Sequence, residues 1–167
     1  MPASDQGVFP DRYMLIPRVL IFVTREENVL LLKGAPNKRL WANLYNGVGG
    51  HVERGEDVLS AAKRELEEET NLSGIDLWLC ATIAIDTNEE IGIGMYVFRG
   101  EWEDGEAISS DEGTLEWVSI GELESLPLVE DLPTLLPRLL AMEREDNPLS
   151  VHYSYSTSGE LILRFGE

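Results

Sequence analysis

The sequence predicts an α/β protein in which a mixed β-sheet lies between helices. Apolar runs of strand length, such as RVLIFVT and VLLLK, recur along the chain and alternate with turn-forming residues. Two longer segments, 57–70 and 131–142, have the composition and spacing of helices. A last stretch, 143–167, alternates apolar and polar residues around 157–160 and predicts a C-terminal β-hairpin.

Size and charge limit the function. With 167 residues, 43% of them hydrophobic, the chain is long enough for one domain with a buried core. It has 13 Lys and Arg against 31 Asp and Glu, a formal net charge of −18. Such a charge opposes binding to nucleic acid or an anionic membrane, so we expect neither partner. A polyphosphate would also be repelled unless metal ions and local cations offset the field.

The N-terminal region predicts no export or membrane insertion. Residues 1–12 are expected to form a flexible tail without the basic and apolar regions of a secretory signal. The apolar run 14–23 contains Pro17 and Arg18 and is too short to span a bilayer. Cys80 lies in a strand-like run and is interpreted as a core residue, with a reactive thiol as the less favoured alternative. We expect a cytoplasmic protein.

The elements follow in chain order. Strands are predicted at 18–24, 29–33, 46–52, 77–86, 91–99 and 115–119, with a helical turn at 120–126. Asp131 is expected to cap the second helix, and Pro137 to disturb its early part. The C-terminal hairpin can extend the sheet, seal the core or pair with a second subunit to give a homodimer. The sequence leaves these three arrangements open.

The most informative stretch is GHVERGEDVLSAAKRELEEETNL, residues 50–72. A helix is predicted from Asp57 to Thr70, and Asn71 should end it because Asn tolerates the left-handed conformation of a C-cap. On this helix an acidic stripe spans about 100°. It consists of Glu65, Glu68 and Glu69, beside a stripe expected to be buried that comprises Leu59, Ala62, Leu66 and Thr70.

The three carboxylates of the acidic stripe repel one another and need a nearby positive charge. Like charges at these spacings repel by about 0.2 to 0.5 kcal/mol per exposed pair, and by more where water is excluded. Arg64 can pair with Glu68 one turn further on, but one guanidinium cannot neutralise three carboxylates. Hard divalent cations bind clustered carboxylate and carbonyl oxygens, so the stripe predicts a magnesium site.

The same residues resemble the signature of the Nudix hydrolases, G-x5-E-x7-R-E-U-x-E-E-x-G-U, where U is a bulky apolar residue. Gly50, Glu56 and the run from Arg64 to Leu72 match it at every specified position except one, where Asn71 replaces the last glycine. The resemblance implies an α/β/α sandwich in which a Nudix domain spans 13–142 and the hairpin 143–167 is an extension.

The resemblance also implies a cofactor and roles for individual residues. The cofactor is Mg²⁺, which Mn²⁺ can replace, and its ligands are the Gly49 carbonyl and the carboxylates of Glu65, Glu68, Glu69 and Glu112. Arg64 would orient these carboxylates and Glu56 would support the loop before the helix. Either Glu68 or Glu112 would accept the proton of the attacking water. Taken alone, Glu112 is explained equally well as a solvated loop acid.

Two further segments resemble the MutT-type branch, which hydrolyses 8-oxo-dGTP. They are WANLYNGVGG and SSDEGTLEWVSIGELESLPLVEDLPTLLPRLL. They imply that Asn46, Glu130 and Asp131 read the purine. Lys33 is separately a candidate phosphate contact because of its charge, although surface solvation explains a single lysine more simply. The implied activity is Mg²⁺-dependent cleavage of a nucleoside triphosphate to monophosphate and pyrophosphate. The alternatives are hydrolysis of ADP-ribose, a dinucleotide or a nucleotide sugar, and a non-catalytic nucleotide sensor.

Overall fold

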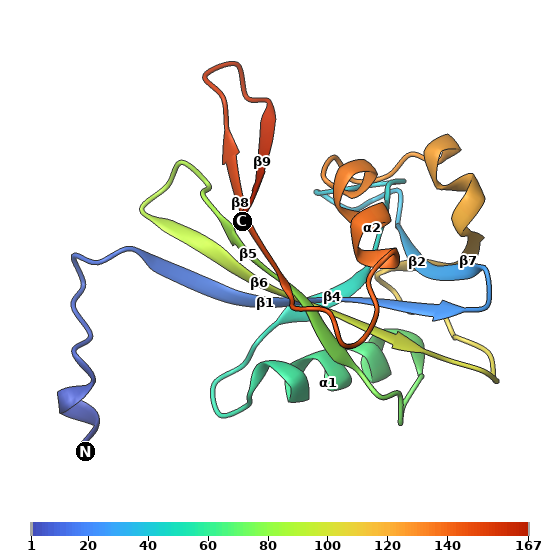
Figure 1. Cartoon of the computed structure of the whole chain (residues 1–167), viewed down its shortest axis with the longest axis horizontal. Coiled ribbons are helices and arrows are strands. Elements are labelled where there is room, and N and C mark those ends of the chain that lie inside the picture. The colour runs from blue at the N-terminus through green and yellow to red at the C-terminus, as the bar shows by residue number, and fades with distance from the viewer. Residues whose placement is uncertain (1, 167) are drawn as a thin grey trace.

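A computed structural model of the protein, which describes residues 2–166, has one nine-stranded mixed sheet with an α-helix on each face (Figure 1). Its centre is the parallel pair β1 (Met14–Arg25) and β6 (Ile91–Glu101), which are in register from Met14↔Ile91 to Thr24↔Glu101. The strand order is β3-β2-β1-β6-β5-β8-β9, with β4 also paired to β1 and β7 to β2. The predicted α/β/α sandwich with a mixed sheet is confirmed.

The sheet divides at β1. β2 (Asn28–Gly34) pairs with β1 only beside their turn, while β4 (Val48–His51) pairs with the middle of β1, from Arg18 to Ile21. β2 therefore diverges from β1 and continues with β7 (Gly113–Ser119) and the short β3 (Tyr45–Asn46). The glycine-rich segment crosses from β3 to β4 at this division, so it joins the two parts of the sheet.

Two apolar clusters lie on opposite faces of the sheet because side chains alternate along each strand. Ile21 of β1 belongs to the cluster under α1 (Val58–Thr70), and Phe22 to the cluster under α2 (Leu132–Leu140). On α1 the buried residues are Ala61, Ala62, Leu66 and Thr70. Leu59, predicted to be buried, is only partly so.

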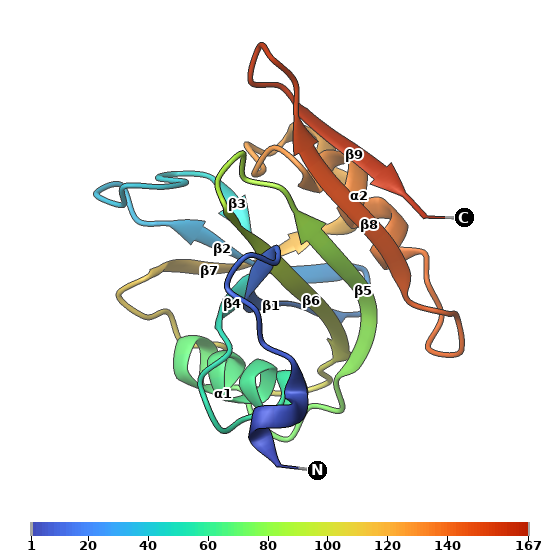
Figure 2. The ribbon, with the colours of Figure 1, turned by 90° about the vertical axis from the view of Figure 1, so that its left-hand side faces the viewer.

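The C-terminal hairpin extends the sheet, which decides one of the open alternatives. β8 (Leu149–Tyr155) runs parallel to β5 (Trp78–Ile85), and β9 (Leu161–Phe165) pairs antiparallel with β8. Figure 2 shows the hairpin alongside α2, on the side of the sheet opposite α1. Its inward residues Val151 and Tyr153 are buried in the α2 cluster.

The segment around the second helix differs from the prediction in two details. Asp131 stands at the N-cap position of α2 but its side chain makes no capping bond, and Tyr153 donates to it instead. Pro137 lies inside the helix without interrupting it, and the helix ends at Leu140 rather than Met142. Before it, 3₁₀ helix η2 (Ile120–Ser125) matches the predicted helical turn.

The remaining details concern single residues and the N-terminal segment. Cys80 is fully buried, as predicted, and burial raises the pKa of its thiol to about 12. The predicted tail contains a short 3₁₀ turn, η1 (Ala3–Gln6), and residues 2–12 are all exposed. Within residues 2–166 there is no helix with the length and apolar character needed to cross a membrane.

Candidate active site at the acidic helix

Local chemistry fixes both ends of α1. Asp57 Oδ1 accepts hydrogen bonds from the backbone N–H groups of Leu59 (2.9 Å) and Ser60 (3.0 Å), which have no partner within the helix. At the other end Asn71 adopts a left-handed conformation (φ 60°), and its N–H donates to the Glu67 carbonyl. Asn71 therefore takes the conformation that glycine usually supplies, and the departure from the Nudix signature leaves the helix end intact.

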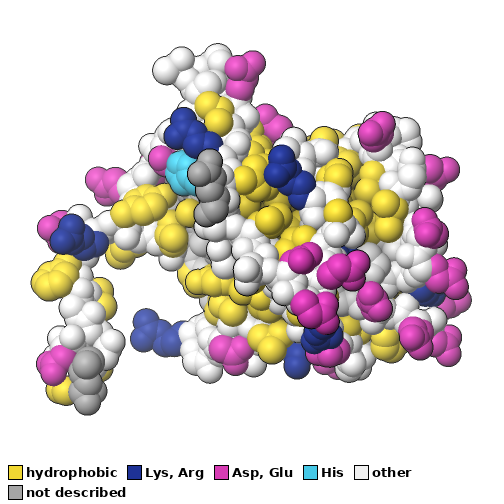
Figure 3. Space-filling model, in the orientation of Figure 1, with side chains coloured by type: hydrophobic (Ala, Val, Ile, Leu, Met, Phe, Trp, Pro, Cys, Tyr) yellow, Lys and Arg dark blue, Asp and Glu magenta, His cyan; other side chains and the backbone are white. Residues whose placement is uncertain are grey.

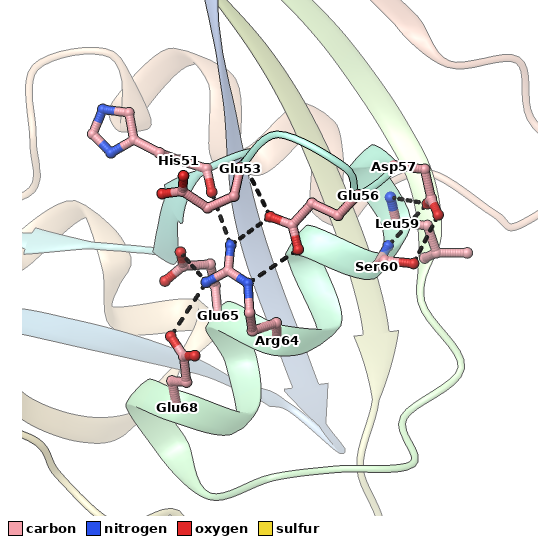
Figure 4. Close-up of polar contacts among 9 residues, drawn as sticks. All are labelled: His51, Glu53, Glu56, Asp57, Leu59, Ser60, Arg64, Glu65 and Glu68. Carbon is pink, nitrogen blue, oxygen red and sulfur yellow. Dashed lines mark hydrogen bonds and ion pairs between the residues drawn. The ribbon is translucent and has the colours of Figure 1, made fainter.

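Arg64 is the centre of the polar network on α1 (Figure 4). Its Nη2 and Nε donate to both oxygens of Glu56 at 2.7 and 3.1 Å, and its Nη1 donates to Glu65 at 2.7 Å and Glu68 at 3.2 Å. Nη2 also donates to the His51 carbonyl of β4. The predicted Arg64–Glu68 pair is thus the longest of several contacts, and the guanidinium connects the helix to the loop before it.

Glu56 is the strongest partner of Arg64. Its Oε1 also accepts from the backbone N–H of Glu53 at 2.8 Å, so the carboxylate closes the turn that enters α1. The Arg64 guanidinium, followed by this backbone bond, lowers the pKa of Glu56. The carboxylates of Glu56 and Glu65 raise the pKa of Arg64, so its guanidinium stays charged at any relevant pH.

Glu69 is the one acid of the stripe with a buried oxygen that lacks a partner. Its Oε2 is inaccessible to solvent and accepts no hydrogen bond among the described residues. Burial, then repulsion from Glu65 and Glu112, raises the pKa of Glu69 to about 7. A buried acceptor without a donor is costly, and a cation would satisfy it.

Glycine allows the loop to approach the helix. A Cβ atom added at Gly50 would collide with the Glu65 carboxylate, and one added at Gly49 would collide with the Val19 carbonyl of β1. β4 therefore lies directly against both α1 and β1. This contact brings the Gly49–Gly50 backbone to the acidic stripe, as the magnesium-site prediction requires.

The acids do not already converge as a ligand set. Within residues 2–166 no group of three His, Cys, Asp or Glu side chains is arranged to hold a metal ion. Arg64 draws Glu65 and Glu68 to itself, and Glu112 pairs with Lys38 of the loop between β2 and β3. The available ligand atoms still fit a hard cation, because they are carboxylate oxygens. The Glu69 carboxyl group, whose Oε2 has no hydrogen-bond partner among the described residues, also lies close enough to Glu65 and Glu112 to be repelled by both.

The residues expected to bind the substrate gather around β3. Backbone hydrogen bonds of about 3 Å join Tyr45 to Pro127 and Val129, so the segment that leads to Glu130 lies against the strand that bears Asn46. Lys33 pairs with Tyr45 across β2 and β3, and its Nζ lies 5.5 Å from the centre of the Tyr45 ring. Residues far apart in sequence thus meet at one end of the divided sheet.

The individual side chains have local partners. Asn46 is half-buried, and its Oδ1 accepts from the Gly47 N–H at 2.8 Å. Lys33 also lines an open hollow of about 400 Å³ between the loop 35–44 and the segment 109–116. Asn46 and the acids of α1 do not line that hollow, so Lys33 is the predicted site residue that faces it.

The acid pair before α2 is tied to the C-terminal hairpin. The Tyr153 hydroxyl donates to Asp131 Oδ2 at 2.9 Å, and the Leu161 N–H donates to Glu130 Oε1 at 3.4 Å. The sequence analysis did not identify Tyr153 as part of the site. The only signal was its place in an alternating strand, which indicates burial but not a polar partner.

The fold and this arrangement define a class of protein. An arginine-organised acidic helix packed by glycines against the centre of a mixed α/β/α sheet is suited to a divalent cation and an anionic substrate. A family model for the NUDIX domain matches residues 14–139, most of the chain, and the protein belongs to the Nudix family. It is a Nudix hydrolase near the MutT branch.

Similar proteins agree with this assignment. The chain is 30% identical over 126 residues to the "Oxidized purine nucleoside triphosphate hydrolase" of Danio rerio, covering 75% of this chain and 80% of that protein. The crystal structure of a MutT protein from Bacillus halodurans superposes with a TM-score of 0.76 at 25% identity, covering 90% of this chain and 97% of that one. The "NAD-capped RNA hydrolase NudC" of Stutzerimonas stutzeri is 29% identical over 80% of this chain but only 47% of its own length.

Proposed function

We propose that the protein is a Mg²⁺-dependent pyrophosphohydrolase that cleaves oxidised purine nucleoside triphosphates, with 8-oxo-dGTP as the representative substrate, to a nucleoside monophosphate and pyrophosphate. The relatives named above and the retained acidic positions support this choice. The observation that carries it is the backbone pairing of β3 with residues 127–129. That pairing brings the strand that bears Asn46 alongside the segment that leads to Glu130 and Asp131, and these three residues are the ones expected to read a purine.

The charges of the molecule suit a metal-dependent reaction on an anion. Acidic side chains gather at the right-hand end of the face in Figure 3, whereas basic ones are scattered. A bound divalent cation would be held by the Gly49 carbonyl and by Glu65, Glu68, Glu69 and Glu112, and it would offset charge on the phosphate oxygens. Without such an ion the net charge of −18 would repel a triphosphate.

The protein's own groups have separate tasks in this proposal. Arg64 holds Glu65 and Glu68 in place through its hydrogen bonds, while Glu56 fixes Arg64 to the loop. The attacking water must lose a proton, and an exposed carboxylate can accept it. Glu68 and Glu112 are both exposed, so both fit the role of base. Lys33 would contact the phosphates.

A substrate panel tests the function. The full-length protein is assayed with Mg²⁺ against 8-oxo-dGTP, dGTP, ADP-ribose, dinucleotides and nucleotide sugars, and the products are identified. We expect pyrophosphate and a monophosphate from 8-oxo-dGTP, with kcat/KM at least about tenfold above that for dGTP, since one good polar contact to a base supplies that discrimination. A clear preference for ADP-ribose or a dinucleotide would refute this proposal and favour the alternative, a Nudix hydrolase that cleaves such diphosphates.

The sensor alternative makes a different prediction. A sensor would bind a nucleotide with a measurable Kd and hydrolyse none in the panel. The intact acids at positions 65, 68 and 69 argue against it, because a protein that only binds has no need of the complete set.

A further inference from the structure

We infer that Tyr153, on the C-terminal hairpin, is a positioning residue for base recognition that acts by holding the Asp131 carboxyl group. This inference rests on the proposed function and adds to the site a strand outside the motif-bearing part of the chain. The evidence is the 2.9 Å hydrogen bond from the Tyr153 hydroxyl to Asp131 Oδ2 between two elements 22 residues apart.

The pair is buried where a hydrogen bond has a large effect. Tyr153 is only 4% exposed and packs in the apolar cluster between the sheet and α2. Its strand is held by β5 on one side and β9 on the other, so the hydroxyl cannot easily turn away. In such surroundings a hydrogen bond to a carboxyl group is strong, and leaving the partner unsatisfied is costly.

The bond also distinguishes the two oxygens of Asp131. Burial, then the Asp131 charge, raises the pKa of Tyr153, so its hydroxyl keeps its proton and remains a donor. Because Oδ2 accepts the Tyr153 hydrogen bond, we expect Oδ1 to meet the ligand and to carry the proton when Asp131 is protonated. An acid that can present either a lone pair or a hydrogen at a fixed position is suited to the edge of a purine.

The groups around Asp131 set its pKa in opposite directions. Burial raises the pKa of Asp131, the Tyr153 hydrogen bond and then its own backbone N–H lower it, the charge of Glu130 raises it, and the Leu132 N–H lowers it. Tyr155, the other titratable group of β8 near this pair, has a raised pKa because of its burial and then the charges of Glu130 and Asp131. Removing the Tyr153 hydroxyl should therefore raise the pKa of Asp131 further.

The hairpin holds the acid pair at a second point. The Leu161 N–H at the start of β9 donates to Glu130 Oε1, so each acid has a partner on a different strand of the hairpin. Because β8 also joins the main sheet, the hairpin links the acid pair to the same framework that holds Asn46. The acid pair and Asn46, the groups proposed to read the base, are thereby held by one framework.

The test is Tyr153→Phe in the full-length protein, with Tyr45→Phe as the matched control. The Tyr45 hydroxyl donates to the Glu116 carboxylate at 2.7 Å, so the control also removes a tyrosine hydroxyl bonded to an acid. We expect Tyr153→Phe to lower kcat/KM for 8-oxo-dGTP about tenfold, mainly by raising KM, while kcat stays within about twofold. The 8-oxo-dGTP to dGTP ratio should fall with Tyr153→Phe but not with Tyr45→Phe.

Asp131→Asn provides the second arm. If Tyr153 acts through Asp131, Tyr153→Phe should have no further effect on the ratio in the Asp131→Asn background. The pH limb of kcat/KM that belongs to Asp131 should move to higher pH in Tyr153→Phe and vanish in Asp131→Asn. Melting temperatures recorded in parallel identify any loss of fold.

Several results would overturn the inference. One is an unchanged 8-oxo-dGTP to dGTP ratio and an unchanged pH profile in Tyr153→Phe, and another is an equal effect of Tyr153→Phe in the wild-type and Asp131→Asn backgrounds. A third is an unaltered 8-oxo-dGTP to dGTP ratio in Asp131→Asn, a result that does not depend on how well Tyr153→Phe folds. Wild-type protein that hydrolyses no triphosphate would refute the proposed function as well. Wild-type activity with an unchanged Tyr153→Phe ratio would refute the inference alone.

Discussion

The two ends of the candidate site are built in different ways. At α1, Arg64 and its acidic partners lie within one short stretch of chain, and the contacts span a turn or a single loop. At the acid pair before α2, Asp131 depends on Tyr153 and Glu130 on Leu161, which belong to a hairpin formed much later in the chain. The proposed phosphate end is therefore a local motif, and the proposed base end is a product of tertiary packing.

The comparison predicts that changes at the two ends separate in their effects. Alterations in the α1 network should reduce turnover of every substrate, because all phosphates meet the same acids. Alterations of Asn46 and of the hairpin contacts to the acid pair should change which base is preferred and leave the phosphate chemistry largely intact.

The largest effect is expected from Glu69→Gln. Removing the charge beside the orphaned oxygen should lower kcat on the order of a thousandfold or more for all nucleotides, with the fold retained. The control is Glu67→Gln, which makes the same change at an exposed position of the same helix and should leave kcat nearly unaltered. Steady-state kinetics with Mg²⁺ and circular dichroism measure both. Normal turnover in Glu69→Gln would remove Glu69 from the metal site.

A smaller effect concerns stability. In protein treated with a chelator, burial and the charges of Glu65 and Glu112 raise the pKa of Glu69 from 4.5 to about 7. Because the folded-state pKa is raised, the stability contributed by Glu69 is complete below about pH 4.5 and is lost as the pH rises through 7. Because the carboxyl group is only partly buried and solvent screens its charge, this difference is worth roughly 1 to 2 kcal/mol. Urea unfolding over this range should show the free energy of unfolding falling less in Glu69→Gln than in wild type, whereas parallel curves would contradict the raised pKa.

The smallest effect is expected at the base end, from Asn46→Ala. Loss of this half-buried amide should reduce the 8-oxo-dGTP to dGTP ratio of kcat/KM by about tenfold and change kcat for either nucleotide by less. Competition assays with both nucleotides measure the ratio directly. A uniform loss for both substrates would mean that Asn46 serves the phosphate end, and the division between the two ends would fail.

The sequence by itself determined the local features. Asp57 and Asn71 predicted the ends of α1 because capping depends on one side chain and its immediate neighbours. The strands and the C-terminal hairpin followed from alternation, which is also local. The acidic stripe was visible because helical geometry places residues three and four apart on one face.

The tertiary structure alone decided which distant groups meet. Asp131 has the residue type and position of an N-cap, yet its backbone is in the right-handed helical region (φ −82°, ψ −27°) and its side chain bonds to Tyr153 instead of to a helix N–H. The pairing of β3 with residues 127–129 and of β8 with β5 likewise could not be read from the chain. Such contacts depend on how whole elements pack, and that information is spread over the entire sequence rather than written at the residues that meet.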